Sequence, residues 1–369
     1  MIINYLSFDS ISEGVGASQV LNLVEAYRYL DHEVNLVTFE KIQPPPHLIN
    51  RIESAGIVWT PIKFGRGGTT GGLVRLQKLI RNIPHGDVIH ARGDLPAFSG
   101  LVGASIPLLW DVRSLWIEQR KIMNPIQFNT AIEVTLGRMN QYVSRNCKAF
   151  TTLTDAIVPE LNYRYQNLPI FHKTIPTCVD LLNFQVSKSP LNRSLKILLL
   201  GNFNNLYDTV WMQRFLFELQ DLVPADVLWA HDSSIGYPDS PLNSFEQTSV
   251  AHHEVPDLIT NSDFGLLLLN NSDDLSLKAA MPTKIAEFWA SGRPIIISGG
   301  VGDVDSLIHE FGVGLSISES MSTLEILESI RLLIADPDTS ERCRFVAEKY
   351  FDIRKAAKDY IDLFQQISS

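Results

Sequence analysis

The densest group of residues suited to chemistry lies in the segment MPTKIAEFWASGRPIIISGGVGD, residues 281–303. Pro282 suits the first position of a helix and Thr283 precedes an amphipathic turn. The backbone N–H groups at a helix start have no partner within the helix and can face a phosphate, and Lys284 adds a positive charge there. Glu287, one turn on, is placed to accept hydrogen bonds from a ribose diol. The alternative is a plain helix–strand unit in which Lys284 and Glu287 pair as surface ions, and the pattern alone leaves both interpretations open.

Short apolar segments alternate with helical ones along the first half of the chain, which predicts a parallel sheet covered on both faces. The expected strands are Ile2–Phe8, Val34–Phe39, Ile57–Ile62, Asp87–Ala91, Pro107–Asp111, Ala149–Leu153 and Lys173–Pro176. A helix is expected over Ser18–Leu30, and the composition of Gly65–Gly72 predicts a mobile loop.

The polar stretch Gln185–Ser194 breaks this rhythm and is expected to be a linker. Strands then resume at Leu195–Leu200, Val227–Ala230, Phe264–Leu269, Pro294–Ser298 and Gly314–Ile317. The sequence therefore predicts an α/β protein with two Rossmann-like domains facing a cleft. The expected parts are an N-terminal domain (1–184), the linker (185–194), a nucleotide-binding C-terminal domain (195–345), and a last helix (346–369) that returns to the N-terminal domain. Ligands are expected at the carboxyl ends of the strands.

Composition narrows the class of protein. The 369 residues are 45% hydrophobic and 20% charged, which is a globular balance. The first residues lack the features of a signal peptide, and no apolar run approaches about 18 residues, so a cytoplasmic protein is expected. The three widely spaced cysteines (Cys147, Cys178 and Cys343) favour reduced thiols and give no support to a zinc site.

Several motifs taken together resemble a known family. The segment 281–303 resembles the donor-binding signature of the family-four glycosyltransferases of GT-B fold. Further resemblances follow in the same order along nearly the whole chain: Gly14–Leu21 to the first glycine-rich loop, then Thr38–Lys41, His90–Arg92, Asp111–Arg113 with Trp116, Ile175–Asp180, Leu200–Asn202 with Tyr207, Glu254–Pro256, and Ser262-Asp263.

This resemblance implies transfer of a hexose from a nucleotide-diphosphate sugar to a glycan, lipid-linked or small-molecule acceptor, with retention at the anomeric carbon. It implies a role in polysaccharide biosynthesis, with the nucleotide sugar as co-substrate and no required metal or other cofactor. Glu287 would hold the ribose, and Thr283 and Lys284 would lie against the diphosphate or donor sugar. The implied donor-binding set is Gly14, Gly16, Asn202, Pro282, Thr283, Lys284 and Glu287.

The sequence departs from the family pattern in two places. Many members carry a second glutamate eight positions before the one at 287, where this chain has Ala279. Many also carry a basic pair after the first strand of the second domain, but here Gly201 is followed by no basic residue until Arg214. Lys284 as a replacement for that missing charge is a hypothesis.

Catalytic and acceptor-side candidates follow the strands of the first half. Asp111 is a candidate to orient substrate hydroxyls, and Arg113 to stabilise the leaving phosphate as its charge grows. Arg92 and, more weakly, Glu118 are acceptor-side candidates. The alternative is structural: an Asp111–Arg113 pair that braces its loop, and an Arg92 that does the same.

Charge is unevenly distributed. Residues 1–173 hold 17 Lys and Arg against 14 Asp and Glu, so the rest of the chain holds 31 − 17 = 14 against 41 − 14 = 27. The segment Lys63–Arg81 contains five basic residues and no acidic one. It is expected to be either a solvated basic helix or a surface for anionic lipid or a phosphate-bearing acceptor, with peripheral contact at the inner face of the membrane. Nucleic-acid binding is disfavoured because the whole chain is acidic.

Two other functions remain open. A catalytically silent relative that acts as a partner or scaffold subunit is consistent with Ala279 and with the base-poor segment after Gly201. A nucleotide-sugar epimerase would need ionisable residues placed for proton abstraction, and the sequence singles out no such set.

Overall fold

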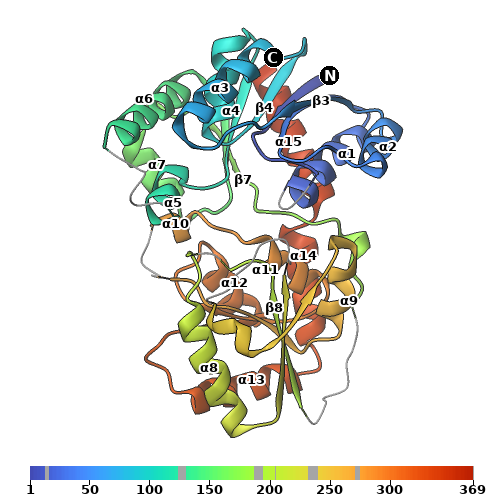
Figure 1. Cartoon of the computed structure of the whole chain (residues 1–369), viewed down its shortest axis with the longest axis vertical. Coiled ribbons are helices and arrows are strands. Elements are labelled where there is room, and N and C mark those ends of the chain that lie inside the picture. The colour runs from blue at the N-terminus through green and yellow to red at the C-terminus, as the bar shows by residue number, and fades with distance from the viewer. Residues whose placement is uncertain are drawn as a thin grey trace. The chain divides into compact units, whose positions relative to one another are not determined.

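A computed structural model describes residues 1–12, 16–123, 130–186, 194–203, 205–231, 240–270 and 275–368. The chain divides into two compact units. Unit 1 comprises Met1–Cys178 and Ile353–Ser369, and unit 2 comprises Val179–Asp352. Each unit is a parallel sheet with helices on both faces (Figure 1), so the predicted α/β fold with two Rossmann-like domains is confirmed.

Unit 1 contains a seven-stranded parallel sheet in the order β3-β2-β1-β4-β5-β6-β7. Its strands are β1 (Ile2–Leu6), β2 (Glu33–Glu40), β3 (Val58–Lys63), β4 (Val88–Arg92), β5 (Leu108–Val112), β6 (Ala149–Thr152) and β7 (Phe171–Thr174). Its helices are η1 (Gly16–Val20), α1 (Leu21–Tyr29), α2 (Pro46–Ser54), α3 (Gly68–Arg81), α4 (Asp94–Gly103), α5 (Trp116–Met123), α6 (Thr130–Asn146), α7 (Val158–Arg164) and α15 (Ile353–Ser368). The strand order reverses between β1 and β4, where ligands of such sheets bind.

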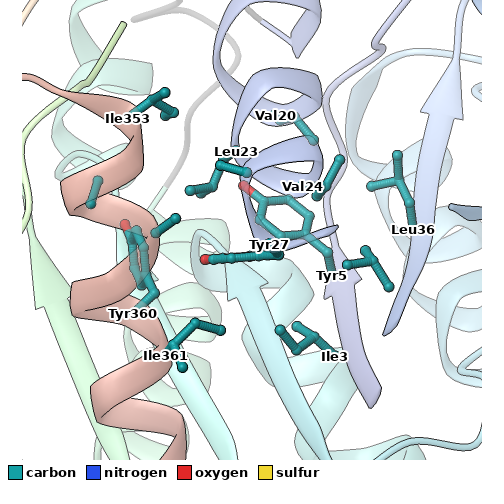
Figure 2. Close-up of a cluster of buried hydrophobic side chains, with 14 of the residues drawn as sticks. Ile3, Tyr5, Val20, Leu23, Val24, Tyr27, Leu36, Ile353, Tyr360 and Ile361 are labelled. Carbon is teal, nitrogen blue, oxygen red and sulfur yellow. The ribbon is translucent and has the colours of Figure 1, made fainter. Parts of the chain in front are cut away.

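Helix α15 completes the core of unit 1 although it comes from the far end of the chain. In Figure 1 it is the red helix among blue and green elements. Its apolar face recurs at helical spacing and is buried, and it packs against α1. Figure 2 shows Tyr360 and Ile361 of this helix beside Tyr27 of α1. Burial of this apolar face stabilises unit 1 by about 25 cal/mol for each Å² of apolar surface removed from water.

Unit 2 contains a six-stranded parallel sheet in the order β10-β9-β8-β11-β12-β13, which reverses between β8 and β11. Its strands are β8 (Leu195–Leu200), β9 (Ala225–His231), β10 (Glu246–Ser249), β11 (Phe264–Leu267), β12 (Ile295–Ser298) and β13 (Gly314–Ile317). Its helices are η2 (Leu181–Asn183), α8 (Thr209–Leu222), η3 (Pro241–Ser244), η4 (His252–Glu254), α9 (Val255–Thr260), α10 (Leu275–Lys278), α11 (Thr283–Ala290), α12 (Val304–Phe311), α13 (Thr323–Ala335) and α14 (Thr339–Tyr350). Strands β11 and β12 and the last four residues of β8 are buried, as expected for apolar runs between two helical layers.

One local expectation was wrong, and one strand was not predicted. The loop predicted over Gly65–Gly72 ends early, because α3 begins at Gly68. The Arg75 guanidinium turns inward from α3, donates to the carbonyl oxygen of Arg66 at 2.8 Å and lies over the Phe64 ring at 4.0 Å, which ties the helix to the preceding chain. Edge strand β10 was not predicted, because its sequence EQTS carries no apolar pattern. Seven residues of the expected linker, 187–193, lie outside the described residues.

Candidate functional site

The start of α11 lies against the end of β8 in unit 2, at the point where the strand order reverses. Gly201 follows β8 with φ +91°, a conformation that favours glycine. A Cβ atom at this position would lie 2.8 Å from Cε and 3.1 Å from Nζ of Lys284. The Lys284 ammonium therefore lies beside Gly201, next to the segment that has no basic residue of its own.

Aromatic rings hold the Lys284 ammonium in place. Its Nζ lies 4.6 Å from the centroid of the Phe203 ring and 4.5 Å from that of Tyr207, and it is 3.3 Å from the Tyr207 hydroxyl. The two rings pack edge to face, 4.8 Å apart. Cation–π contacts of this kind stabilise an ammonium by about 0.5–2 kcal/mol each. No carboxylate among the described residues forms an ion pair with Lys284, so its charge is available to an anion.

Glu287 is a buried carboxylate one turn along the same helix, and only 6% of the residue is exposed. No described residue donates a hydrogen bond to its carboxyl oxygens. Burial raises the pKa of this carboxyl to about 7, and the Lys284 ammonium offsets only part of the rise. A buried carboxylate without donors is costly to a protein, and a ligand that brings two hydroxyl groups would relieve that cost.

Three backbone amides of the glycine turn after β12 donate hydrogen bonds within the protein. The amide of Gly299 donates to the Ile317 carbonyl oxygen, that of Gly300 donates to the Asp305 carboxylate at 2.7 Å, and that of Gly302 donates to the Leu277 carbonyl oxygen. The positive φ angles of Gly300 and Gly302 shape this turn. These three amides tie the turn to β13, α12 and α10 and are not directed at a ligand.

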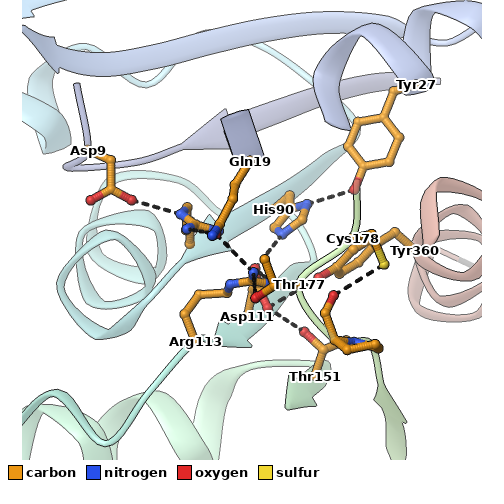
Figure 3. A network of polar contacts seen from close by, with 12 residues as sticks. Asp9, Gln19, Tyr27, His90, Asp111, Arg113, Thr151, Thr177, Cys178 and Tyr360 are labelled. Carbon is orange, nitrogen blue, oxygen red and sulfur yellow. Dashed lines mark hydrogen bonds and ion pairs between the residues drawn. The ribbon is translucent and has the colours of Figure 1, made fainter. Parts of the chain in front are cut away.

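In unit 1, Asp111 at the end of β5 is the centre of a buried polar network (Figure 3). It is 0% exposed. Its Oδ1 accepts from the hydroxyls of Thr151 at 2.9 Å and Tyr360 at 3.2 Å. Its Oδ2 lies 3.3 Å from Nε2 of His90 and 3.7 Å from Nη1 of Arg113. The network joins three strands to α15, and this geometry favours the bracing role of Asp111 over contact with a substrate.

The charges of this network depend on one another. Burial alone would raise the pKa of Asp111, but the Arg113 guanidinium and the hydrogen bond with His90 hold it well below its usual range. Burial lowers the pKa of His90 despite its contact with Asp111. His90 therefore stays neutral near pH 7, with its Nδ1 2.9 Å from the Tyr27 hydroxyl.

Arg92 and Arg113 lie side by side at the ends of β4 and β5. Nε of Arg92 donates to Asp9 at 2.7 Å. Nη2 of each guanidinium donates to the same atom, Oε1 of Gln19, at 2.6 Å from Arg92 and 3.2 Å from Arg113. Arg113 also donates to the Thr177 hydroxyl at 3.1 Å. The sequence indicated neither Gln19 nor Asp9 as a partner, because no local pattern links positions so far apart.

Glu40 holds the chain that leads into the first glycine-rich loop, a role that the sequence did not indicate. Its buried carboxylate accepts five hydrogen bonds, from the hydroxyls of Ser10, Ser12 and Thr38 and from the amides of Ile11 and Ser12. Gly16 follows in η1, where a Cβ would lie 2.0 Å from the Ser10 carbonyl oxygen. Glycine is required at Gly16 by the chain's own backbone, which explains this part of the motif without a ligand.

The remaining predicted residues have different positions. Gly14 lies outside the described residues. Asn202 lies in the loop after Gly201, and Pro282 is the N-cap of α11 with Thr283 as its first residue. Glu118 on α5 forms an ion pair with Arg164 of α7, which fits a structural role. The structure thus groups Lys284 and Glu287 in unit 2, and Arg92, Asp111 and Arg113 in unit 1.

All three cysteines are buried and none forms a disulfide within the described residues. Across the described ranges, no cluster of three or more His, Cys, Asp or Glu side chains is arranged to hold a metal ion. The helices found in those ranges include none with the length and apolar character that crossing a membrane requires.

Several solved structures superpose on nearly the whole of this chain. Sucrose-phosphate synthase from Thermosynechococcus elongatus superposes with a TM-score of 0.70 at 14% identity, over 99% of this chain and 98% of that one. HepE from Anabaena, in complex with UDP, gives 0.72 at 14% identity over 99% and 100%. WaaG, a glycosyltransferase involved in lipopolysaccharide biosynthesis, gives 0.67 at 11% over 99% of both chains. The chain shares the two-domain GT-B fold of these glycosyltransferases. No family model and no curated protein matches the sequence.

Proposed function

We propose that this protein is a glycosyltransferase that takes a sugar from a nucleotide-diphosphate donor bound on unit 2. The observation that carries the proposal is the state of Lys284 and Glu287 on α11, with the Lys284 ammonium beside Gly201 at the end of β8. Within the described parts of the chain, Lys284 has no carboxylate as an ion-pair partner and the buried Glu287 carboxylate has no hydrogen-bond donor, and the two lie one helical turn apart. A nucleoside diphosphate supplies both missing partners, a phosphate anion and a ribose diol.

The chemistry of this arrangement follows from its charges. Lys284 and the first amides of α11 offset the charge of the diphosphate, which grows on the leaving group as the glycosidic bond breaks. Because protein groups supply this positive charge, we propose that transfer requires no metal ion. In agreement with the family-four resemblance, we propose that the sugar is a hexose, that its anomeric configuration is retained, and that the product is a glycan or polysaccharide precursor.

Unit 1 is the acceptor-side domain in this proposal. Arg92 and Arg113 are the groups that contact the acceptor, and Asp111 positions Arg113 through their ion pair. Solved structures of HepE with UDP and with UDP-glucose lend support, since they show nucleotide and nucleotide sugar bound to a protein of this fold.

A nucleotide-sugar screen tests the proposed function. Purified protein is heated with UDP-, GDP-, ADP- and TDP-sugars, and the donors that raise the unfolding temperature are assayed for product with a panel of sugar and lipid-linked acceptors. We expect one donor class to stabilise the protein by several degrees and to give a glycosylated product. If no nucleotide sugar stabilises the protein, the proposal is wrong. Stabilisation without turnover would favour the silent-subunit alternative.

We also propose that the protein is cytoplasmic and that unit 1 contacts the anionic inner face of the membrane through α3. The helix exposes Lys78 and Arg81 together with the apolar side chains of Leu73 and Val74, whereas Arg75 is turned inward. Near an anionic surface each basic residue contributes about 1 kcal/mol. The double charge reversal Lys78→Glu/Arg81→Glu is therefore expected to weaken binding to phosphatidylglycerol vesicles at least about tenfold in a flotation assay.

The matched control for this experiment is Lys355→Glu/Lys358→Glu, which reverses two exposed charges on α15 of the same unit. It is expected to leave vesicle binding close to that of the wild type, and neutral phosphatidylcholine vesicles are expected to bind neither form. Equal flotation of the α3 variant and the wild type would contradict the membrane proposal.

A further inference from the structure

The paired guanidiniums of unit 1 converge on a neutral oxygen atom. Arg92 is the last residue of β4, and Arg113 lies just after β5. These strands are neighbours, with Arg92 opposite Asp111 in the register. Both Nη2 atoms donate to Oε1 of Gln19. Figure 3 shows the Gln19 side chain reaching toward Arg113, and Asp9 at the left of the view. Two forked cations aimed at one point form the geometry that binds phosphate and carboxylate groups.

Burial and charge show that Gln19 is a weak partner for this pair. The Arg92 side chain is 7% exposed and that of Arg113 is 15% exposed. The buried Nε of Arg113 has no acceptor among the described residues. The Asp111 carboxylate, the ionic partner of Arg113, also contacts His90. The amide oxygen of Gln19 carries no net charge. An anionic oxygen in the same place would add a charge–charge attraction to both guanidiniums, which the neutral amide oxygen of Gln19 lacks.

The position of the pair within the sheet supports a ligand site. Arg92 and Asp9 belong to β4 and to the chain after β1, the two strands between which the order of the sheet reverses. Gln19 comes from η1, a π-helical turn, and such turns are frequent at functional sites. Asp9 is 48% exposed, so its release to solvent when an anion arrives would cost little.

We propose that Arg92 and Arg113 bind an oxyanion, a phosphate or carboxylate group carried by the acceptor, and that Gln19 holds its place in the unliganded protein. This inference rests on the proposed function, in which an acceptor binds to unit 1, and it specifies the chemical class of that acceptor. Asp111 keeps the Arg113 fork in position, and the Thr177 hydroxyl fixes one of its nitrogens.

The test uses the full-length protein with inorganic phosphate and with acetate as separate probes, and binding is measured by calorimetry and by the shift of the unfolding temperature. Gln19→Glu places a permanent carboxylate between the guanidiniums. We expect this variant to unfold at a higher temperature and to bind the preferred probe at least tenfold more weakly than the wild type. Gln19→Ala removes the competing oxygen and is expected to bind the probe more tightly. A response to phosphate identifies a phosphorylated acceptor group, and a response to acetate a carboxylate.

Controls separate this site from the donor site of unit 2. Lys284→Gln is expected to leave the Gln19-dependent binding intact, and so is Arg28→Gln, which removes a half-buried arginine bonded to backbone oxygens of unit 1. Binding of neither probe to the wild type and Gln19→Ala, or equal binding to wild type and Gln19→Glu, would overturn the inference. Nucleotide-dependent stabilisation is measured in the same variants. If Gln19→Glu retains it, the donor proposal stands whatever the probes show, and if the wild type lacks it, the donor proposal fails independently.

Discussion

Replacing Glu287 by alanine is expected to weaken the binding of the nucleotide sugar about 100-fold, because two charge-assisted hydrogen bonds to the ribose, about 1.5 kcal/mol each, are lost. The same substitution removes a buried carboxylate that has no donor among the described residues. Without ligand, Glu287→Ala is therefore expected to unfold at the wild-type temperature or above it. Calorimetry with the donor identified in the screen measures the first effect, and thermal unfolding the second.

The control for this prediction is Glu328→Ala, which removes an exposed carboxylate from α13 of the same unit. It is expected to bind the donor like the wild type. Unchanged donor affinity in Glu287→Ala would remove the donor assignment, and a large loss of stability without ligand would mean that Glu287 has a structural partner instead.

The raised pKa of Glu287 adds a pH dependence with a definite sign. Burial raises this pKa from 4.5 to about 7, so ionisation of the carboxyl costs native stability as the pH rises through this range. The ionised form is the stronger acceptor for ribose hydroxyls. Donor affinity is thus expected to increase from pH 6 to pH 8 in the wild type. UDP-glucose suits this titration because its phosphates do not ionise further in that range. Glu287→Gln, with no titrating group, is expected to show no such increase.

Replacing Asp111 by alanine is expected to destabilise unit 1 by about 3–5 kcal/mol, because the buried Arg113 guanidinium loses its ionic partner. The hydroxyls of Thr151 and Tyr360 lose their acceptor as well, and α15 loses its polar contact with β5. Asp111→Asn keeps an acceptor oxygen and is expected to cost less. Chemical denaturation, followed by circular dichroism, measures the difference.

A matched substitution in the same unit is Asp87→Ala. Asp87 accepts one exposed hydrogen bond, from the amide of Ile2 at 2.7 Å. Its removal is expected to cost about 1 kcal/mol or less. If Asp111→Ala were no more destabilising than this control while transfer activity was abolished, Asp111 would act on the substrate, and the bracing role assigned to it would be wrong.

Much of the fold follows from local sequence. Apolar runs such as residues 197–200 of β8 have no polar face, so a strand buried between two helical layers satisfies them. The predicted helix start near Pro282 is found in α11, which begins at Thr283 with Pro282 as its N-cap, because its start signal and its apolar spacing agree. Polar β10 was missed because an edge strand needs no apolar alternation.

The candidate site was less predictable because its contacts join distant parts of the chain. Tyr360 reaches Asp111 across 249 positions, and Gln19 reaches Arg113 across 94. The sequence singled out Asp111 and Arg113 but left their partners open, and only the folded structure shows that Asp111 is enclosed. The sequence led to the hypothesis that Lys284 replaces the basic residues missing after Gly201. Its side chain lies beside Gly201, which agrees with that hypothesis, and sequence spacing could not have predicted this contact.

A crystal structure of the protein with its nucleoside diphosphate tests the central claim most directly. We predict the ribose hydroxyls within hydrogen-bond distance of the Glu287 carboxylate, and a phosphate oxygen beside the Lys284 ammonium at the start of α11. A nucleotide bound elsewhere, with Glu287 still buried and without a ligand partner, would contradict the account.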